Sequence, residues 1–119
     1  MPELIQTPTR IPVPGGKVID EYVGRANTGT DALSVAQMSA PGGWTEPAQT
    51  PRFDEITLVL RGVVRVEYTG GSMDVGAGQA VLTKAGETVR YSTPSEEGAD
   101  YVAICVPAFA PELAGRADD

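Results

Sequence analysis

The chain has 119 residues, of which 41% are apolar and 21% charged, and its net charge is −7 at pH 7. This length and composition predict one globular domain with a hydrophobic core of its own. The acidic balance argues against nucleic acids and anionic membrane surfaces as partners, because both need clustered basic side chains and this chain has two lysines and seven scattered arginines.

Strand and turn signals dominate the chain, which contains fourteen glycines and ten prolines. Residues 1–16 hold four prolines and predict an extended arm or an edge strand. The strand candidates that follow are short and are bounded by glycine, proline or polar turns. In chain order they are residues 17–23, 33–39, 55–60, 63–68, 72–75, 79–83, 88–93 and 101–107. About eight closely spaced strands predict an all-β sandwich or barrel.

Glycine and proline predict where these elements are interrupted. Gly62 is expected to separate two strands, and Thr69-Gly70-Gly71-Ser72 predicts a hairpin in which paired glycines supply the positive φ of a type I′ turn. Residues 111–116 predict a short helical turn that begins at a proline. We therefore expect an arm over residues 1–16, a barrel over 17–110, and a tail over 111–119 that frays at Asp118-Asp119.

The cysteine count and the apolar runs limit the class of protein further. Cys105 is the only cysteine, which excludes an intrachain disulfide and a cysteine-only metal site. Without a histidine to activate it, Cys105 is expected to be a small buried residue rather than a nucleophile. No apolar run approaches the roughly 20 residues of a membrane span, and the first residues lack the layout of a signal peptide, so we expect a cytoplasmic protein.

Two segments carry the most informative spacing. GWTEPAQTPRFDEITLVLRG places Gly43, Glu55 and Gly62 at the spacing Gly, five residues, His, one residue, His, three residues, Glu, six residues, Gly. GQAVLTKAGETVRYST places Gly78 and Gly86 at the spacing Gly, five residues, Pro, one residue, Gly. Over residues 33–107 the chain resembles small single-domain bacterial cupins, and more weakly their ethanolamine-utilisation branch. The resemblance implies a single-domain cupin jelly-roll β-barrel.

The same resemblance identifies what has happened to the metal site. In typical cupins three histidines and a glutamate hold Fe, Mn, Ni or Zn, and position by position these ligands become Gln49, Pro51, Glu55 and Val89. Proline and valine side chains cannot ligate, Gln49 is a weak donor, and one carboxylate binds a transition metal poorly. The resemblance therefore implies a cupin with no metal and no other cofactor.

The alternation of strand faces predicts the lining of the barrel. Glu55 and Tyr91 are the predicted catalytic residues. Burial should raise the pKa of Glu55 into the range of a general acid or base. Tyr91 or Tyr101 could donate a hydrogen bond to an oxyanion. Alternatively, Glu55 is a relic held by Arg52, Thr57 or a backbone N–H. The residues predicted to bind substrate are Gln49, Thr57, Trp44, Arg52, Gln37 and Tyr101.

Three of these assignments have alternatives. Trp44 could cap the pocket mouth, pack in the core or lie at a dimer interface. Arg52 could bind a ligand carboxylate or pair with a neighbouring Asp54 or Glu55, and either Gln37 or Met38 should reach the pocket. The sequence also leaves open which face of the last strand lines it, although the face with Tyr101, Ala103 and Cys105 is the more polar.

Two functions remain compatible with these residues. The first is a metal-free cupin that binds a small organic molecule and runs a non-redox isomerisation, cyclisation or elimination, with Glu55 moving the proton; this favours a cofactor-independent isomerase, cyclase or lyase over a metal-dependent dioxygenase. The second is a non-catalytic ligand-sensing or assembly protein that uses the apolar face of Ile56, Leu58 and Leu60. A homodimer is expected in both cases.

Overall fold

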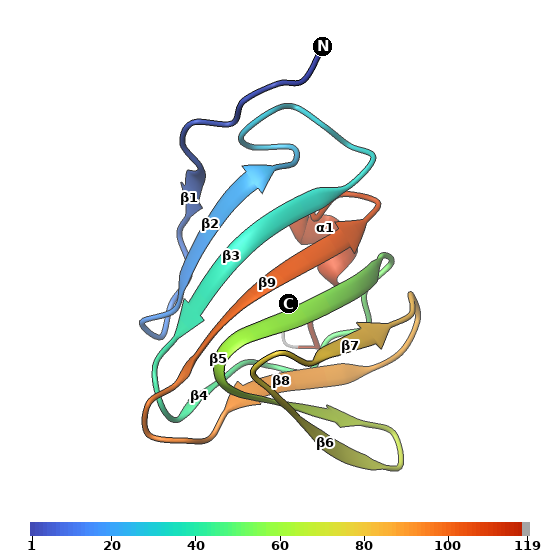
Figure 1. Ribbon diagram of the computed structural model, residues 1–119. Coiled ribbons are helices and arrows are strands. Elements are labelled where there is room, and N and C mark those ends of the chain that lie inside the picture. The colour runs from blue at the N-terminus through green and yellow to red at the C-terminus, as the bar shows by residue number, and fades with distance from the viewer. Residues whose placement is uncertain (118–119) are drawn as a thin grey trace.

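A computed structural model of the protein describes residues 1–117 and confirms the all-β prediction (Figure 1). Within this range the chain forms nine strands and one short helix. They are β1 (Thr9–Ile11), β2 (Val18–Val23), β3 (Ser34–Ala40), β4 (Trp44–Thr45), β5 (Asp54–Tyr68), β6 (Gly71–Gly76), β7 (Ala80–Thr83), β8 (Val89–Thr93), β9 (Ala99–Val106) and α1 (Pro111–Ala114).

The strands pair antiparallel in a strongly curled sheet that encloses an interior (Figure 1). Their order is β1-β2-β3-β9-β5-β8-β4, and β6 and β7 also pair with β5. The first half of β5 pairs with β9 and β7 in one wall, and its second half pairs with β6 and β8 in the other. The two walls are therefore joined by one continuous strand.

This continuity corrects the prediction that Gly62 separates two strands. Gly62 instead lies inside β5, where it has a φ of +77°, and the β5–β9 register shifts between Val59 and Arg61. A Cβ at position 62 would overlap the carbonyl oxygen of Gly98. Only glycine combines this φ with so close a backbone approach, so the residue bends the strand without ending it.

The predicted hairpin between β5 and β6 is confirmed, but its turn differs. Tyr68 pairs with Gly71, which leaves Thr69 and Gly70 as the two turn residues. Only Gly70 has a positive φ, of +102°, so the prediction of a paired-glycine type I′ turn is wrong. The shift of one residue places Gly71 in the ladder of β6.

The two ends of the described chain are also attached to the barrel. β1 pairs with β2, so part of the N-terminal segment is an edge strand, and α1 occupies the first part of the predicted helical turn. The predicted fraying at Asp118-Asp119 lies outside the described residues. No helix within residues 1–117 has the length and apolar character needed to cross a membrane.

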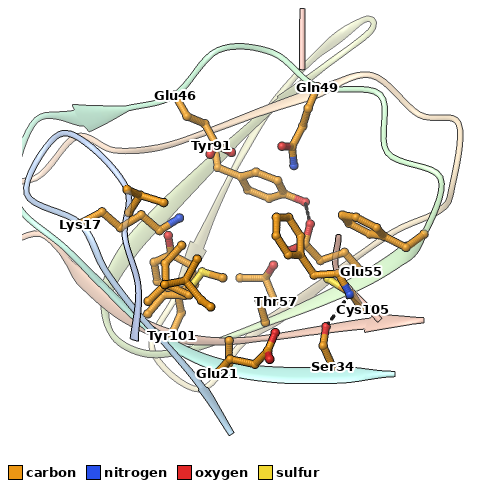
Figure 2. A pocket seen from close by; sticks show the side chains of 18 of the residues that line it. Lys17, Glu21, Ser34, Glu46, Gln49, Glu55, Thr57, Tyr91, Tyr101 and Cys105 are labelled. Atoms are coloured by element: carbon orange, nitrogen blue, oxygen red, sulfur yellow. Dashed lines mark hydrogen bonds between the residues drawn. The ribbon is translucent and has the colours of Figure 1, made fainter. Parts of the chain in front are cut away.

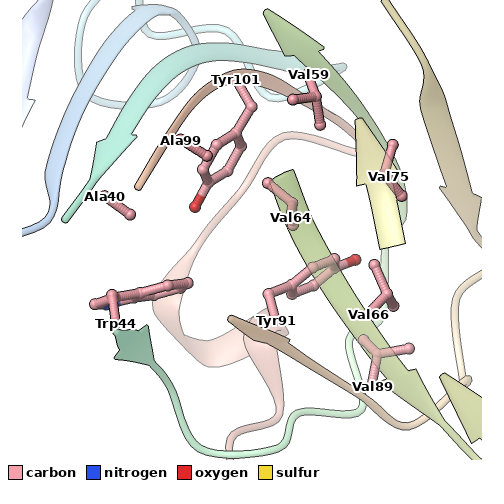
Figure 3. Packing of buried hydrophobic residues seen from close by; sticks show 10 residues of the cluster. All are labelled: Ala40, Trp44, Val59, Val64, Val66, Val75, Val89, Tyr91, Ala99 and Tyr101. Carbon is pink, nitrogen blue, oxygen red and sulfur yellow. The ribbon is translucent and has the colours of Figure 1, made fainter. Parts of the chain in front are cut away.

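A cluster of buried apolar side chains fills one end of the interior (Figure 3). Val59 and Val64 are fully buried there, and burying a valine contributes roughly 2 kcal/mol to folding. Tyr91 and Tyr101 also belong to this cluster, and both line the cavity beside it. The core therefore holds the two phenol rings in place at the edge of the cavity.

Candidate functional site

The interior beside the core is a cavity whose walls come from β2, β3, β5, β8 and β9 (Figure 2). It leaves about 70 Å³ for the centres of water-sized molecules, and an outer hollow beside it leaves about 270 Å³ by the same measure. Five residues border both spaces. They are Val13, Lys17, Ile19, Glu46 and Arg116. These residues therefore form the boundary between the cavity and the outer hollow.

Glu55 lies on the inner face of β5 and is only 9% exposed. Its Oε1 accepts a hydrogen bond of 3.3 Å from Tyr91 Oη, which is also within 3.1 Å of the Thr83 hydroxyl. Burial, followed by the charge of Glu46, raises the pKa of Glu55 to about 7, although Lys17 and the Tyr91 hydrogen bond oppose the rise. Near neutral pH the carboxyl group can therefore either donate or accept a proton.

Lys17 and Glu46 are two ionisable residues of the cavity that the sequence prediction missed. Lys17 directly precedes β2, and its Nζ lies 4.2 Å from the centroid of the Trp44 ring and 5.4 Å from that of Tyr101. Burial lowers the pKa of Lys17 against the opposing charges of Glu46 and Glu55. Burial also raises the pKa of Glu46, which Lys17 and Arg116 counteract.

A usable signal existed for Lys17 but not for Glu46. Lys17, just before β2, and Ile19 and Glu21 within it are spaced two residues apart, and all three line the cavity, as a two-residue period requires of one strand face. Glu46 stands in the irregular segment between β4 and β5, where no period predicts the direction of a side chain.

Tyr101 is the cavity residue whose polar group most clearly lacks a partner. Its buried hydroxyl makes no hydrogen bond to any residue in the described part of the chain. Burial raises the pKa of both Tyr91 and Tyr101, so both phenols remain protonated donors. Leaving a buried hydroxyl unpaired costs about 1–3 kcal/mol, which an acceptor atom on a ligand would recover.

Five of the predicted site residues are brought together in this cavity. They are Glu55, Tyr91, Gln49, Thr57 and Tyr101. Trp44 lies in β4, where it packs in the core, one of its predicted roles, and also borders the outer hollow; its role as a cap stays a prediction. Tyr101, Ala103 and Cys105 all line the cavity, which settles the orientation of β9.

Two predicted substrate-binding residues lie elsewhere. Gln37 is exposed, because the inner face of β3 carries Ser34, Ala36 and Met38, and of the alternatives Gln37 and Met38 only Met38 lines the cavity. The prediction that Gln37 reaches the pocket is therefore corrected, because the alternation along β3 turns its side chain outward.

Arg52 is exposed between the buried Pro51 and Phe53, and it does not line the cavity. Its backbone N–H donates to the carbonyl of Leu113 at 2.8 Å. Within residues 1–117 Arg52 forms no ion pair, whereas Asp54 is 3.8 Å from Lys84. Arg52 therefore lies outside the cavity and does not pair with Asp54 or Glu55, and its binding of a ligand carboxylate stays a prediction.

Cys105 is buried, as expected, and faces the cavity. Burial, followed by the charge of Glu55, raises the pKa of its thiol. The uncharged thiol is a poor nucleophile. Cys105 is therefore best described as part of the cavity wall.

Residues 42–116 match the family described as the AraC-like ligand binding domain. The chain belongs to this family. AraC-like ligand binding domains are of cupin type, and solved cupin structures share the fold seen here. The family match covers β4 to β9 and therefore includes Glu55, Tyr91 and Tyr101.

Three solved structures illustrate how this AraC-like domain compares with known folds. Oxalate decarboxylase of Bacillus subtilis has a TM-score of 0.80 at 20% identity, covering 97% of this chain and 31% of that one. KdgF of Halomonas has a TM-score of 0.69 at 17% identity, covering 83% and 87%. EutQ of Clostridium difficile has a TM-score of 0.62 at 18% identity, covering 77% and 70%. At these identities the likeness confirms the cupin jelly-roll fold alone.

A curated relative is similar in sequence to this AraC-like domain. The protein named "Endoribonuclease YbeY" of Myxococcus xanthus is 46% identical over 104 residues, which cover 87% of this chain and 35% of that protein. The chain thus spans about a third of the length of the curated relative it matches, and the name applies to that protein as a whole.

The residues present do not fit the metal that typical cupins hold. Gln49 and Val89 exchange backbone hydrogen bonds of 2.8 and 2.9 Å, so the fold brings two former ligand positions side by side. Val89 belongs to the apolar core, however, and Pro51 is buried with no ligating side-chain atom. Across residues 1–117, no group of three or more His, Cys, Asp or Glu side chains is arranged to hold a metal ion. The donor set is unsuited to a transition metal.

Proposed function

We propose that the barrel of this AraC-like domain binds a small organic molecule and catalyses a non-redox proton transfer on it, as in an isomerisation, cyclisation or elimination. The observation that supports this proposal is the state of Glu55, whose buried carboxyl group has a pKa of about 7 and faces a cavity open to the outside. A general acid or base works best when its pKa lies near the working pH.

The cavity residues divide the proposed reaction between them. The ionised Glu55 takes a proton from the bound molecule and returns it at a second position as the neutral acid. Tyr91, which donates to Glu55, keeps the carboxyl group oriented, and Tyr101 has a free hydroxyl that can donate to an oxygen on which negative charge develops. Gln49 and Thr57 supply further polar groups to position the molecule. The proposed reaction involves no net oxidation or reduction of the substrate.

The test begins with native mass spectrometry of freshly purified protein, which identifies a co-purifying small molecule. NMR in D2O then follows deuterium incorporation into that molecule. We expect exchange with the wild type and with Gln37→Ala, whose side chain lies outside the barrel, and a loss of at least about 100-fold with Glu55→Gln. Undiminished exchange in a Glu55→Gln protein that still binds the molecule would contradict the proposal.

A second candidate function is supported by the outer surface of β5. Ile56, Leu58 and Leu60 are 40%, 39% and 50% exposed. Ile56 pairs in register with Leu82 on β7 and Ile104 on β9, so the apolar surface crosses three strands. Contiguous exposed apolar surface is typical of a protein–protein interface. We therefore propose that a homodimer buries this surface, and that a sensing or assembly protein could use the same contact without catalysis.

Analytical ultracentrifugation tests the dimer. We expect a wild-type dimer, a monomer for the double variant Ile56→Arg/Leu58→Arg, and a dimer for Ser72→Glu, which adds a charge to the exposed strand β6. A monomeric wild type would contradict the interface. A dimer that binds a small molecule without deuterium exchange would favour the non-catalytic function.

A further inference from the structure

The two lysines of the chain have very different surroundings. Lys84 is on an exposed turn, where 65% of its side chain is accessible and its Nζ lies 3.8 Å from Asp54. Lys17 instead borders both the cavity and the outer hollow. Its amine enters the pocket from the side opposite Glu55, next to Tyr101 (Figure 2). One amine is thus solvated and paired, and the other faces the space that a ligand must enter.

The contacts of Lys17 are with rings rather than with a carboxylate. Its Nζ lies above Trp44 and Tyr101, at 4.2 and 5.4 Å from the ring centroids. Among the described residues no carboxylate oxygen comes within the 4.0 Å of an ion pair with Lys17, although Glu46 and Glu55 line the same cavity. A lysine that served only as a counter-ion to these carboxyl groups would be expected to pair with one of them.

We propose that Lys17 forms an imine with a small aldehyde or ketone bound in the cavity. The inference rests on the proposed function in one respect, because it takes the cavity to be the ligand site, and it names the carbonyl compounds as the substrate class. The decisive geometry is an amine that has no ion-pair partner among the described residues and borders both the cavity and the outer hollow, in a cavity also lined by three carboxyl groups and a free phenol. The carboxyl groups are those of Glu21, Glu46 and Glu55, and the phenol is that of Tyr101.

The reaction balances with groups that the cavity supplies. The lone pair of the neutral Lys17 amine attacks the carbonyl carbon, the C=O π electrons move to oxygen, and that oxygen takes a proton from the Glu55 or Glu46 carboxyl group. The nitrogen then returns a proton to the carboxylate. The hydroxyl group leaves as water with a proton from the acid, and the nitrogen lone pair forms the C=N bond. The net change is amine plus carbonyl plus carboxylic acid to protonated imine plus water plus carboxylate, with no oxidant or reductant.

The surroundings of the amine favour both the attack and its product. Burial lowers the pKa of Lys17, with Glu46 and Glu55 opposing the change and Arg116 adding to it, so a larger fraction of neutral amine is present near pH 7 than for an exposed lysine. A protonated imine retains the positive charge of the ammonium group. The contacts with Trp44 and Tyr101 can therefore stabilise the product as well as the free lysine.

An imine on Lys17 would also make the proposed proton transfer to Glu55 easier. A protonated imine withdraws electrons from the carbon next to the former carbonyl group and acidifies its C–H bond. The ionised Glu55, on the other side of the cavity, can remove that proton and return it to a different atom. The substrate class that fits both groups is a small aldehyde or ketone with a hydrogen on the adjacent carbon.

Reductive trapping tests the inference directly, because the chain itself provides the comparison. Propanal, an uncharged probe that fits a small cavity, is added to the full chain with sodium cyanoborohydride at pH 7. Peptide mass spectrometry then measures the N-propyl group on Lys17 and on Lys84. We expect Lys17 to be labelled at least about tenfold faster than Lys84, because burial favours the neutral, nucleophilic form of the Lys17 amine. Equal labelling of both lysines, or an unlabelled Lys17, overturns the proposal.

Two controls connect the labelling to the fold. In 6 M guanidinium chloride the preference for Lys17 should disappear, since both amines are then solvated; a preference that persists would assign it to local sequence and overturn the proposal. Lys17→Arg keeps a positive charge above the rings but removes the nucleophile. We expect this variant to fold, by circular dichroism, and to lose all labelling except that of Lys84 and the terminal amine; further labelling inside the cavity would contradict the assignment to Lys17.

The imine and the proposed proton transfer fail separately. Deuterium exchange that survives Glu55→Gln contradicts the proton transfer, while preferential labelling of Lys17 in the same variant still supports the imine. Conversely, equal labelling of the two lysines contradicts the imine even where exchange depends on Glu55.

Discussion

Two buried glutamates line the same cavity and are held in different ways. Glu21, on β2, is 4% exposed, and its Oε2 accepts backbone N–H groups of Ala26 and Asn27 at 2.9 and 3.1 Å. Glu55, on β5, is 9% exposed and accepts one hydrogen bond of 3.3 Å from a side chain. Burial alone therefore does not identify a working carboxyl group; the number and source of its donors distinguish a loop anchor from a group with lone pairs free for a ligand.

Removing the anchor should have the largest effect. Glu21→Ala leaves two N–H groups of the loop after β2 without their acceptor, and we expect a loss of about 3 kcal/mol in the free energy of unfolding. Urea denaturation measures this change. Glu21→Gln keeps one acceptor oxygen and should recover part of the loss. A loss below about 1 kcal/mol in the alanine variant would show that the two glutamates are not so different.

Replacing Glu55 by Gln should raise the free energy of unfolding at pH 8, whereas Glu21→Ala should lower it. The pKa of Glu55 is about 7 in the folded state against 4.5 ordinarily, so the folded state holds the extra proton between these values. Its contribution to stability is fully present below about pH 4.5 and is lost as the pH rises through 7. At pH 8 we expect Glu55→Gln to gain about 2 kcal/mol, less than the roughly 3 kcal/mol implied by the shift, because the amide also needs partners.

Thermal and urea unfolding at pH 5 and pH 8 check this expectation. The wild type should lose stability between the two conditions, and the Glu55→Gln variant should lose much less. Equal destabilisation of the variant at both pH values would mean that the carboxyl group is anchored after all, as Glu21 is.

The smallest effect on stability should come from removing the hydroxyl group of Tyr91, the single hydrogen-bond donor to Glu55. Tyr91→Phe removes a hydrogen bond that favours the carboxylate, so the pKa of Glu55 should rise further, by about half a unit to one unit. The free energy of unfolding should fall by about 1 kcal/mol. Carboxyl ¹³C NMR titration measures the pKa, with Tyr68→Phe on the exposed end of β5 as the control. An unchanged or lower pKa would mean that the phenol does not hold the carboxyl group.

Strand alternation made much of the cavity predictable. Once Glu55 faces inward, Thr57 and Val59 follow, and the same period places Tyr91 and the polar face of β9. It failed for Gln37 because both faces of β3 mix polar and apolar residues: Ser34 precedes Ala36 on one, and Val35 precedes Gln37 on the other. Neither phase is clearly the more apolar, so only the fold decides.

Backbone requirements explain the remaining differences. The four glycines of the cupin spacing, at positions 43, 62, 78 and 86, all have positive φ, so the spacing is needed by the chain path whether or not a metal is bound. What the sequence could not show is the approach of the Gly98 carbonyl to Gly62, which makes a residue that usually interrupts a strand part of a long one. The position of Glu46 over the cavity depends in the same way on distant segments.

The bend at Gly62 has a consequence for the acidity of the site. Both residues of the Tyr91–Glu55 hydrogen bond are positioned by β5. Glu55 belongs to this strand, and Tyr91 pairs with Val66 in the part of β5 beyond the bend. A change in the angle between the two halves of β5 would therefore be expected to change the distance between the Tyr91 hydroxyl and the Glu55 carboxyl oxygen. A second protein that bound the ends of β5 and altered this angle would therefore change the pKa of Glu55 inside the barrel.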